Sequence, residues 1–211
     1  MTDRATFIST LRRALTVPVP PPRHPFMDVS GGLPPVEYAP GPSGVEAFTE
    51  NLTLLAGAVE RTQMKSAAEV VRKLVNGRAP VLLGAEPIVA ELKLEGIQWP
   101  DCGIKAASES AISVVGVRAA IARTGSVVVD ARLGHGRAVS LLPPACVFVF
   151  RESQLVETPG DVLRNRERYW PEGPPSQVVL VTGPSRSADI EMTLTRGVHG
   201  PGEVHAVIVE G

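Results

Sequence analysis

The sequence is poor in cysteine, in aromatic residues and in long apolar runs, and neither sign of charge dominates. Its 211 residues include two cysteines, Cys102 and Cys146, and 4% aromatic residues. Two cysteines cannot hold an iron–sulfur cluster, which usually takes a full set of thiolate ligands, and we expect both to be small buried side chains. The scarcity of aromatic rings predicts an aliphatic core, which favours parallel strands covered by helices over a β-sandwich.

The charges are balanced and dispersed. There are 21 basic and 22 acidic residues, and no block of Lys and Arg suits a nucleic-acid surface. The longest apolar run, residues 145–150, has the length of a strand, and three arginines, Arg4, Arg12 and Arg13, interrupt the N-terminus. We therefore expect a cytoplasmic protein that binds neither nucleic acid nor membrane.

Three common catalytic and nucleotide-binding motifs are also missing. The sequence contains no Gly-x-Ser-x-Gly elbow, no P-loop and no Gly-x-Gly-x-x-Gly fingerprint. Their absence argues against a serine hydrolase, an NTPase or an ordinary dinucleotide-binding enzyme. We predict no cofactor and no metal site.

The chain begins with an appendage. Residues 3–15 have the apolar spacing of an amphipathic helix, with Thr2 or Asp3 available as its N-cap. Residues 16–43 contain nine prolines, which exclude helix and central strand. We therefore divide the chain into a helix with a Pro-rich linker over residues 1–44 and an α/β domain over 45–211. The helix either docks on the core, caps a site, or engages another subunit, so that a homo-oligomer through this arm is one prediction.

The remaining sequence alternates helical and strand patterns. Helices are predicted over 45–59, 66–75, 86–94, 161–168 and the residues before Thr124, and strands over 79–84, 126–129, 145–150, 177–182 and 203–209. This alternation predicts an α/β fold with a mostly parallel sheet and helices on both faces.

The segment from residue 183 to 203 has the strongest site-like character. It lies between the last two predicted strands, and we expect a helix of about ten residues within it, too short to be stable alone. Ser185 or Ser187 would cap this helix and Asp189 would lie in its first turn. A strand that opens into a Gly183-Pro184-Ser185 turn and a helix presents backbone N–H groups to a ligand.

Several residues of this segment are not explained by the formation of a helix. Arg186 would add a guanidinium suited to a carboxylate or phosphate, or would pair with Asp189 or Glu191 in solvent. His199 is a general base, a metal ligand or a loop hydrogen-bonder, and we keep Glu191 and His199 as weak acid–base candidates. The spacing of these residues matches no metal-ligand template.

Two further turns are predicted to join this site. Thr124-Gly125-Ser126 either holds an anion or is a plain turn, and Gly84 to Glu86 follow a short aliphatic strand. We predict that these two turns and residues 183–189 converge at the carboxyl edge of the sheet, where open α/β sheets bind ligands.

A long motif resembles a known family. Gly183-Pro-Ser-Arg-Ser-Ala-Asp-Ile-Glu191 with Gly197-Val-His-Gly-Pro201, preceded by Ala120-Ile-Ala-Arg-Thr-Gly-Ser126, is similar to the LUD-domain family, and the resemblance covers about residues 45–209. It implies a Rossmann-like three-layer sandwich, the fold shared by glucosamine-phosphate deaminases, ribose-phosphate isomerases and CoA transferases. Arg123 stands where we expect an acidic residue in the family, and it would alter specificity if that position touches the ligand.

The resemblance also implies a function. It indicates a role in the oxidation of L-lactate to pyruvate, as an accessory or regulatory component beside partner proteins that carry the iron–sulfur clusters, with a small anionic metabolite as ligand. The alternative is a stand-alone enzyme of isomerase or acyl/CoA-transferase type that acts on a phosphorylated or CoA-linked substrate, for which analogy of fold is a weak argument.

Overall fold

The computed structural model describes residues 3–15, 43–132, 137–187 and 195–211. The chain divides into two units, residues 1–40 and 41–211, and each is described by itself. In the first unit, helix α1 (Arg4–Leu15) begins after Asp3, whose Oδ1 accepts hydrogen bonds from the backbone N–H groups of Ala5 at 2.7 Å and Thr6 at 3.2 Å. The predicted N-terminal helix is confirmed, with Asp3 as its cap.

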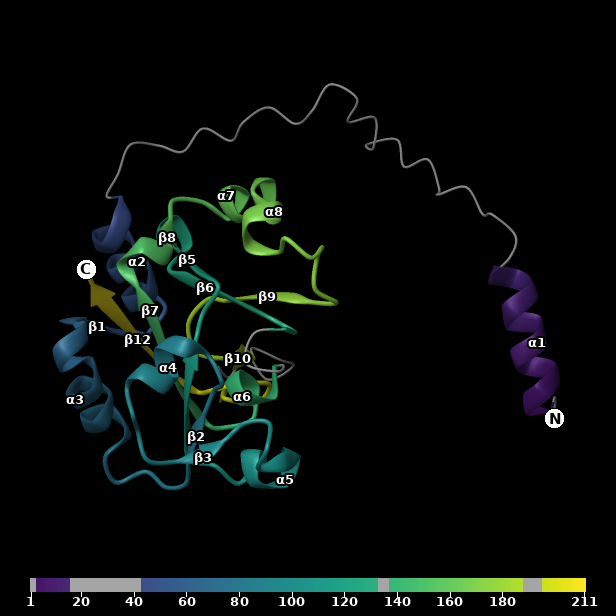
Figure 1. The fold of residues 1–211 in the computed structure, drawn as a ribbon, viewed down its shortest axis with the longest axis horizontal. Helices are drawn as coiled ribbons and strands as arrows, with labels where there is room; N and C mark the ends of the chain where they lie inside the picture. Colours follow the sequence, from purple (N-terminus) through teal and green to yellow (C-terminus); the bar gives the residue numbers. More distant parts are fainter. Residues whose placement is uncertain (1–2, 16–42, 133–136, 188–194) are drawn as a thin grey trace. The chain divides into compact units, whose positions relative to one another are not determined.

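The second unit is built on a six-stranded sheet in which all neighbouring strands are parallel (Figure 1). In spatial order its strands are β1 (Ala58–Gln63), β12 (Glu203–Glu210), β7 (Ala145–Arg151), β4 (Ile112–Gly116), β2 (Val81–Leu83) and β3 (Ile97–Gln98). The central strands β4 and β7 are buried nearly throughout, which is why they read as continuous apolar runs. The predicted α/β fold with a mostly parallel sheet is confirmed.

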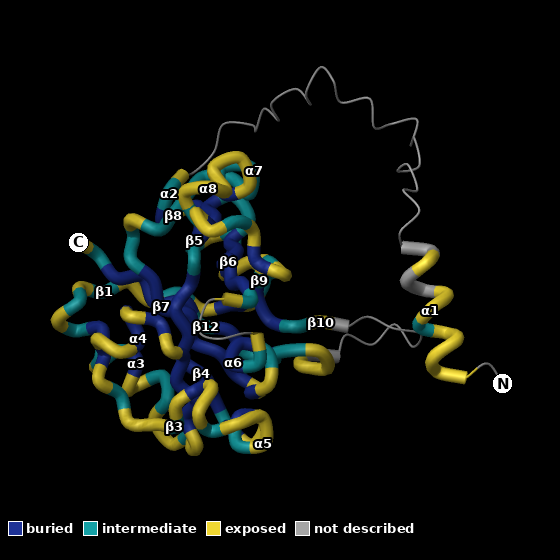
Figure 2. Tube along the Cα trace, turned by 45° about the vertical axis from the view of Figure 1, so that its right-hand side comes forward, coloured by how far each residue is buried: buried dark blue, intermediate teal, exposed yellow. Residues whose placement is uncertain are grey.

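Helices cover both faces of this sheet. On one face, α3 (Met64–Val75) and α4 (Pro87–Glu91) form a core with the strands, in which Val71 and Val89 pack with Val147 and Val207. On the other face lie α2 (Gly44–Leu54), α5 (Gly103–Ser108) and α6 (Ala138–Leu141). The dark-blue strands of Figure 2 run between these more exposed helices. The arrangement is the Rossmann-like layered sandwich that the sequence predicts.

A second sheet, which the sequence did not predict, packs on the same face as α2. Its strands are β8 (Leu155–Val156), β5 (Ala119–Ile121), β6 (Ser126–Asp130) and β9 (Val178–Val181), with β6 antiparallel to both β5 and β9. Two short helices, α7 (Pro159–Arg164) and α8 (Arg166–Tyr169), replace the single predicted helix over 161–168. Val162 on α7 and Trp170 just after α8 bury the outer face of this sheet.

Several predicted elements are therefore wrong. The helix expected before Thr124 is instead two strands of different sheets, β4 and β5, followed only by the short 3₁₀ turn η1 (Ala122–Thr124). The strand over 177–182 belongs to the second sheet, not to the parallel one. The helix expected over 45–59 ends at Leu54, and the strand β1 follows it at the edge of the main sheet, where its polar, half-exposed residues gave no apolar alternation.

The helix expected between residues 183 and 203 is also wrong at both of its ends. Strand β10 (Arg186–Ser187) pairs antiparallel with β11 (Thr195–Arg196), so these residues form a hairpin-like ladder rather than helical turns. The middle of the predicted helix, including Asp189 and Glu191, lies outside the described residues.

Candidate functional site at the carboxyl edge of the sheet

A cavity of about 310 Å³ lies where β2, β4 and β7 end. It is lined by Glu86, Pro87, Ile88, Glu91, Gly116, Val117, Arg118, Arg151 and Gln154. Gly116 and Arg151 are the last residues of β4 and β7, and Glu86 follows the end of β2. Parallel α/β sheets bind ligands in the crevice outside the carboxyl ends of their strands, which makes this cavity the first candidate for a site.

Glu86 supplies a buried carboxylate to the cavity. The residue is 4% exposed, and its Oε2 accepts a hydrogen bond from the backbone N–H of Gly116 at 3.1 Å. Two glycines make room for it: a Cβ added at Gly116 would lie 2.6 Å from the Cβ of Glu86, and one at Gly84 would collide with the carboxylate. Side chains at either position would therefore displace Glu86.

Arg118 brings a guanidinium to the same cavity, held by a buried acid. Its Nε donates to Asp130 Oδ2 at 2.9 Å. Asp130 is fully buried, and its carboxylate also accepts the indole N–H of Trp170 at 2.9 Å and the backbone N–H of Arg132 at 2.8 Å. Because a guanidinium carries five N–H donors, Arg118 can be fixed through Nε and still present donors at the cavity wall.

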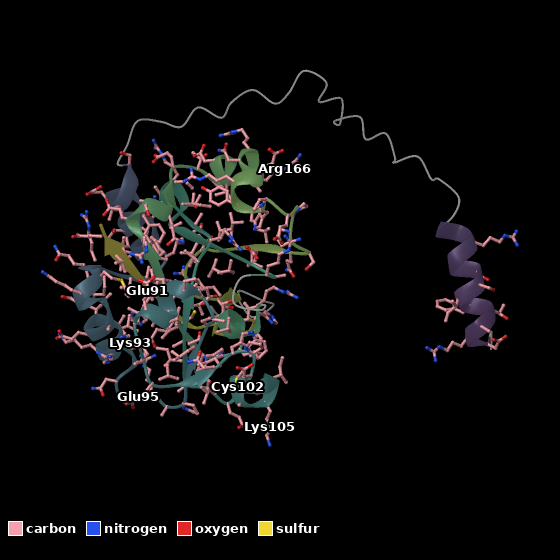
Figure 3. The ribbon with its side chains drawn as sticks, in the orientation of Figure 1. Glu91, Lys93, Glu95, Cys102, Lys105 and Arg166 are labelled. Carbon is pink, nitrogen blue, oxygen red and sulfur yellow. The ribbon has the colours of Figure 1, made fainter. Side chains whose placement is uncertain are left out.

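Arg151 brings a second guanidinium group to the cavity. Its Nη2 lies 2.7 Å from Oε2 of Glu91, which is labelled on α4 in Figure 3. The backbone N–H of Arg151 donates to Gln154 Oε1 at 2.8 Å, and Gln154 Nε2 donates to the carbonyl of Val117 at 2.7 Å. The cavity thus combines two guanidinium groups with the carboxylates of Glu86 and Glu91, a set that suits a small ligand carrying both a negative charge and a hydrogen-bond donor.

A larger hollow of about 650 Å³ lies between α2 and the edge strand β1. Val45, Leu54 and Val59 provide its apolar lining, and its charged residues, Glu46, Glu50 and Arg61, are exposed to solvent. It lacks a buried charged or polar group like Glu86 among its described lining residues, so volume alone does not make it the better site for a polar ligand.

The three predicted segments do not converge. Gly84 and Glu86 are at the cavity, but the turn of Thr124, Gly125 and Ser126 packs against α2, where a Cβ added at Gly125 would lie 2.9 Å from the Cα of Leu52. Gly125 has φ +58°, and Ser126 Oγ is hydrogen-bonded to Thr182 Oγ1 at 2.8 Å. These contacts give the turn a structural role, and anion binding by Thr124, Gly125 and Ser126 stays a prediction.

Residues 183–186 lie at the amino edge of the main sheet, the end at which its parallel strands begin. The N–H of Ser185 donates to the carbonyl of Pro201 at 2.8 Å, and Gly202 N–H donates to Pro144 at 2.9 Å, directly before β12 and β7 begin. The predicted location at the carboxyl edge is therefore wrong.

The side chains of this segment are used locally. Arg186 Nη2 donates to the carbonyl of Leu55, Ser185 Oγ accepts the backbone N–H of His199 at 3.4 Å, and His199 itself is exposed. Gly183 and Pro184 are buried, with Gly183 packed against Leu55. Arg186 is in a strand and not at a helix N-terminus, which removes the stated basis for an anion site; ligand binding by Gly183, Pro184, Ser185 and Arg186 stays a prediction.

Arg123 is likewise engaged away from the cavity. Its Nε lies 2.6 Å from Oε1 of Glu157, and its backbone N–H donates to the carbonyl of the same residue at 3.1 Å. The ion pair between Arg123 and Glu157 thus connects η1 to the residue that follows β8.

The described residues offer no cluster of three or more His, Cys, Asp or Glu side chains that could hold a metal ion. Cys146 is buried in the main core, and desolvation raises the pKa of its thiol to about 12. This cysteine is therefore an unreactive core residue, as the sequence predicts, whereas Cys102 is only partly buried, so the prediction that both are buried is wrong for Cys102. Across the described ranges there is also no helix long and apolar enough to cross a membrane.

Sequence reasoning missed three polar residues that line the cavity, Arg118, Arg151 and Gln154, and Asp130, which holds Arg118. A signal was available for two of them. Arg151 comes directly after the apolar run of residues 145–150, and Asp130 ends the run of residues 126–129. Charged residues at strand ends are candidates for a site, but only the parallel pairing of β4 with β7, in which Gly116 is the partner of Val149, brings the ends of the two strands and hence Arg151 to one cavity.

Comparison with known proteins agrees with this fold. The chain is similar to lactate utilization protein C of Bacillus licheniformis, with 31% identity over 153 residues, which cover 64% of each chain. It is 28% identical over 171 residues to lactate utilization protein C of Geobacillus kaustophilus, covering 72% of this chain and 71% of that one. With the Macrococcus caseolyticus protein of the same name it shares 38% identity over 97 residues, which span 40% of that relative's length.

A solved structure and a family profile complete the comparison. The crystal structure of a DUF162 family protein from Deinococcus radiodurans has a TM-score of 0.61 and 21% identity, covering 78% of this chain and 95% of that chain. At this identity it supports the fold alone. The LUD domain profile matches residues 45–209, which is most of the chain. The chain belongs to the LUD-domain family.

Proposed function

We propose that the protein is an accessory or regulatory component of L-lactate utilization that binds a small carboxylate in the cavity at the carboxyl ends of β2, β4 and β7. The printed names of the relatives support the process. The observation that carries the site is the joint presence of Arg118, Arg151 and the buried Glu86 around one cavity of about 310 Å³. Guanidinium groups recognise carboxylates in a two-pronged geometry that a lysine does not reproduce.

The same proposal includes partners. The part of the chain described by the structure offers no metal-binding cluster, and its two cysteines are far too few for an iron–sulfur cluster. We propose that partner proteins with iron–sulfur clusters carry the electrons in the oxidation of L-lactate to pyruvate. The N-terminal arm, residues 1–44, is our candidate for contacts with such a partner or with a second copy.

Deletion of the gene from the host tests the process. We expect growth on L-lactate as carbon source to fail and growth on pyruvate to be normal, with restoration by the full chain. Affinity capture of the full chain from lactate-grown cells should recover proteins with iron–sulfur absorbance, and light scattering of the purified chain reports its oligomeric state. Normal growth of the deletion strain on L-lactate would contradict the proposal.

A second candidate is an enzyme of isomerase or acyl/CoA-transferase type. The observation in its favour is a carboxylate buried beside a cavity, since such groups act as acid–base or nucleophilic catalysts. A thermal-shift screen with sugar phosphates and CoA esters separates the two. Stabilisation by one of these compounds, with L-lactate inert, would favour the enzyme over the accessory component.

A further inference from the structure

We infer that strand β9 is a surface of self-association, at which the second sheets of two copies of this chain join by antiparallel pairing of β9 with β9. The inference does not depend on the proposed function. It assigns to the second sheet a role in assembly that is separate from the contacts proposed for the N-terminal arm.

The backbone of β9 is used on one side only within the described part of the chain, because β9 ends the second sheet and pairs with β6 alone. The N–H of Ala131 donates to the carbonyl of Gln177, and the register of the two strands places these residues opposite each other. Hydrogen-bonded pairs alternate with non-bonded pairs along an antiparallel ladder. Val178, Leu180 and Thr182 therefore direct their backbone N–H and C=O groups away from β6.

These outward groups form an open edge. Over residues 43–132, 137–187 and 195–211, no backbone hydrogen bond outside the pairing with β6 reaches Val178, Leu180 or Thr182. The side chain of Leu180 is 42% exposed, and Gln177 and Thr182 are also exposed. A strand edge with free N–H and C=O groups and an exposed apolar side chain is a surface on which another strand can pair.

The other edge strands have protection that β9 lacks. Strand β1 carries Glu60 and Arg61, and Arg61 forms ion pairs with Glu152 and Glu210. Strands β3 and β8 are two residues long. Charged side chains and short length are the means by which proteins prevent pairing at a sheet edge. Strand β9 has four residues, all of them uncharged and aliphatic.

A second copy is the occupant that fits this edge, because β9 is complementary to itself. In two-fold symmetric pairing through the outward groups, Leu180 faces Leu180 of the second copy, and Val178 faces Thr182 of the second copy. Pro175 and Pro184 lie on either side of β9, and neither can donate to a ladder. They confine the pairing to the residues between them, and Leu180 lies near the middle of that segment.

The charges beside β9 agree with the same arrangement. The nearest charged residue before the strand is Glu172 and the nearest one after it is Arg186, and both are exposed. Antiparallel pairing directs the N-terminal flank of each strand toward the C-terminal flank of the other. Each acidic flank is thus brought toward a basic one, and no like charges face each other within the paired strands.

The test is sedimentation velocity of the full chain over a wide range of concentrations, in which a monomer–dimer equilibrium should appear. Leu180→Lys places two like charges opposite each other at the two-fold axis, so the dissociation constant of the dimer should rise more than about tenfold. Leu163→Lys is the matched control, since Leu163 on α7 is 60% exposed, and it should leave the equilibrium unchanged. Circular dichroism checks that both variants are folded.

A cross-link tests the register. The Cα atoms of a hydrogen-bonded antiparallel pair are about 5.5 Å apart, which is within the range of about 4.4–6.8 Å for a disulfide. Oxidised Leu180→Cys should therefore give a covalent dimer on a non-reducing gel. Leu163→Cys should give no more dimer than the unaltered chain, in which Cys102 and Cys146 set the background.

Three outcomes overturn the inference. A chain that is monomeric at every concentration would leave the edge of β9 to a strand of a different protein. A dimer that Leu180→Lys does not weaken would be held together elsewhere, as by the N-terminal arm. Equal cross-linking of the two cysteine variants would show that β9 does not meet its copy. If Leu180→Lys fails to fold, the cross-link at position 180 decides.

Discussion

The two ends of the strands in the six-stranded sheet each carry a glutamate, in different surroundings. At the amino edge, Glu203 accepts hydrogen bonds from two nitrogens of Arg78, at 2.7 and 2.9 Å, and lies 2.6 Å from Nε2 of His205. At the carboxyl edge, Glu86 is buried, is held by the Gly116 N–H, and lines a cavity. The carboxylate of Glu203 is bound by Arg78 and contacts His205, whereas that of Glu86 lines a cavity that a ligand can enter.

The surroundings of Glu203 allow it to contribute to the stability of the fold. The hydrogen bonds from Arg78, with the contribution of His205, lower the pKa of Glu203 to about 2, although partial burial acts in the other direction. Glu203 begins β12, and Arg78 follows α3, so this ion pair ties a helix–strand connection to a central strand. The amino edge therefore uses its charges to hold the fold, and we assign ligand binding to the carboxyl edge.

The largest expected effect comes from Gly116→Ala. The added Cβ would lie 2.6 Å from the Cβ of Glu86, an atom close to the backbone that cannot easily move. Overpacking of this kind costs about 1–3 kcal/mol, which urea denaturation followed by circular dichroism will measure. Gly200→Ala at the amino edge is the control, since its Cβ would be 3.6 Å from the Cβ of Ser185, an ordinary contact. Equal losses of stability in the two variants would contradict the contrast between the edges.

A smaller effect is expected from Arg78→Ala. The variant loses both hydrogen bonds to Glu203, but the two side chains are 34% and 44% exposed, so solvent screens the pair. We expect the free energy of unfolding to fall by about 1 kcal/mol, near the upper end for partly exposed ion pairs. Affinity for L-lactate should be unchanged in a titration of the same variant. A weakened affinity would mean that the amino edge also contributes to binding.

The smallest effect is expected in how the stability of the protein changes at acid pH. The folded-state pKa of Glu203 is about 2, below the ordinary value of 4.5. Its contribution is therefore fully present above about pH 4.5 and is lost as the pH falls from there through about 2. Urea midpoints measured between about pH 6 and about pH 3 should decline less steeply for Glu203→Gln than for the wild-type protein, because the amide does not titrate in this range. Parallel declines would show that Glu203 has no part in the acid sensitivity.

The sequence predicts the strands and helices whose burial is uniform along a whole strand or along one face of a helix. Strand β7 is buried on both faces over residues 145–150 and β12 over residues 206–209, and both therefore contain continuous apolar runs, while α3 has one apolar face that contacts the sheet through Ala67 and Val71. The edge strand β1 was not predicted, because it has no such apolar run. Its neighbour lies on one side only, and it keeps polar residues such as Glu60 and Arg61 that a helix tolerates equally well.

The site is harder to predict because its members come from separate strands. Glu86 was found, since it follows a short apolar strand with a glycine. Arg118 and Arg151 stand 33 positions apart and meet at one cavity only through the pairing of β4 with β7. The distinctive residues 183–201 attracted attention, but in the part of this segment that the structure describes, the polar groups of Ser185 bond locally to Pro201, Gly197 and His199. A distinctive motif can thus reflect how a loop is closed.

Asp130 has a consequence that reaches beyond the cavity wall. The same buried carboxylate holds the guanidinium of Arg118 and the indole of Trp170, and Trp170 packs with Val162 of the outer helical layer. The position of Arg118 at the cavity and the packing of the outer helical layer on the second sheet therefore share one buried acceptor.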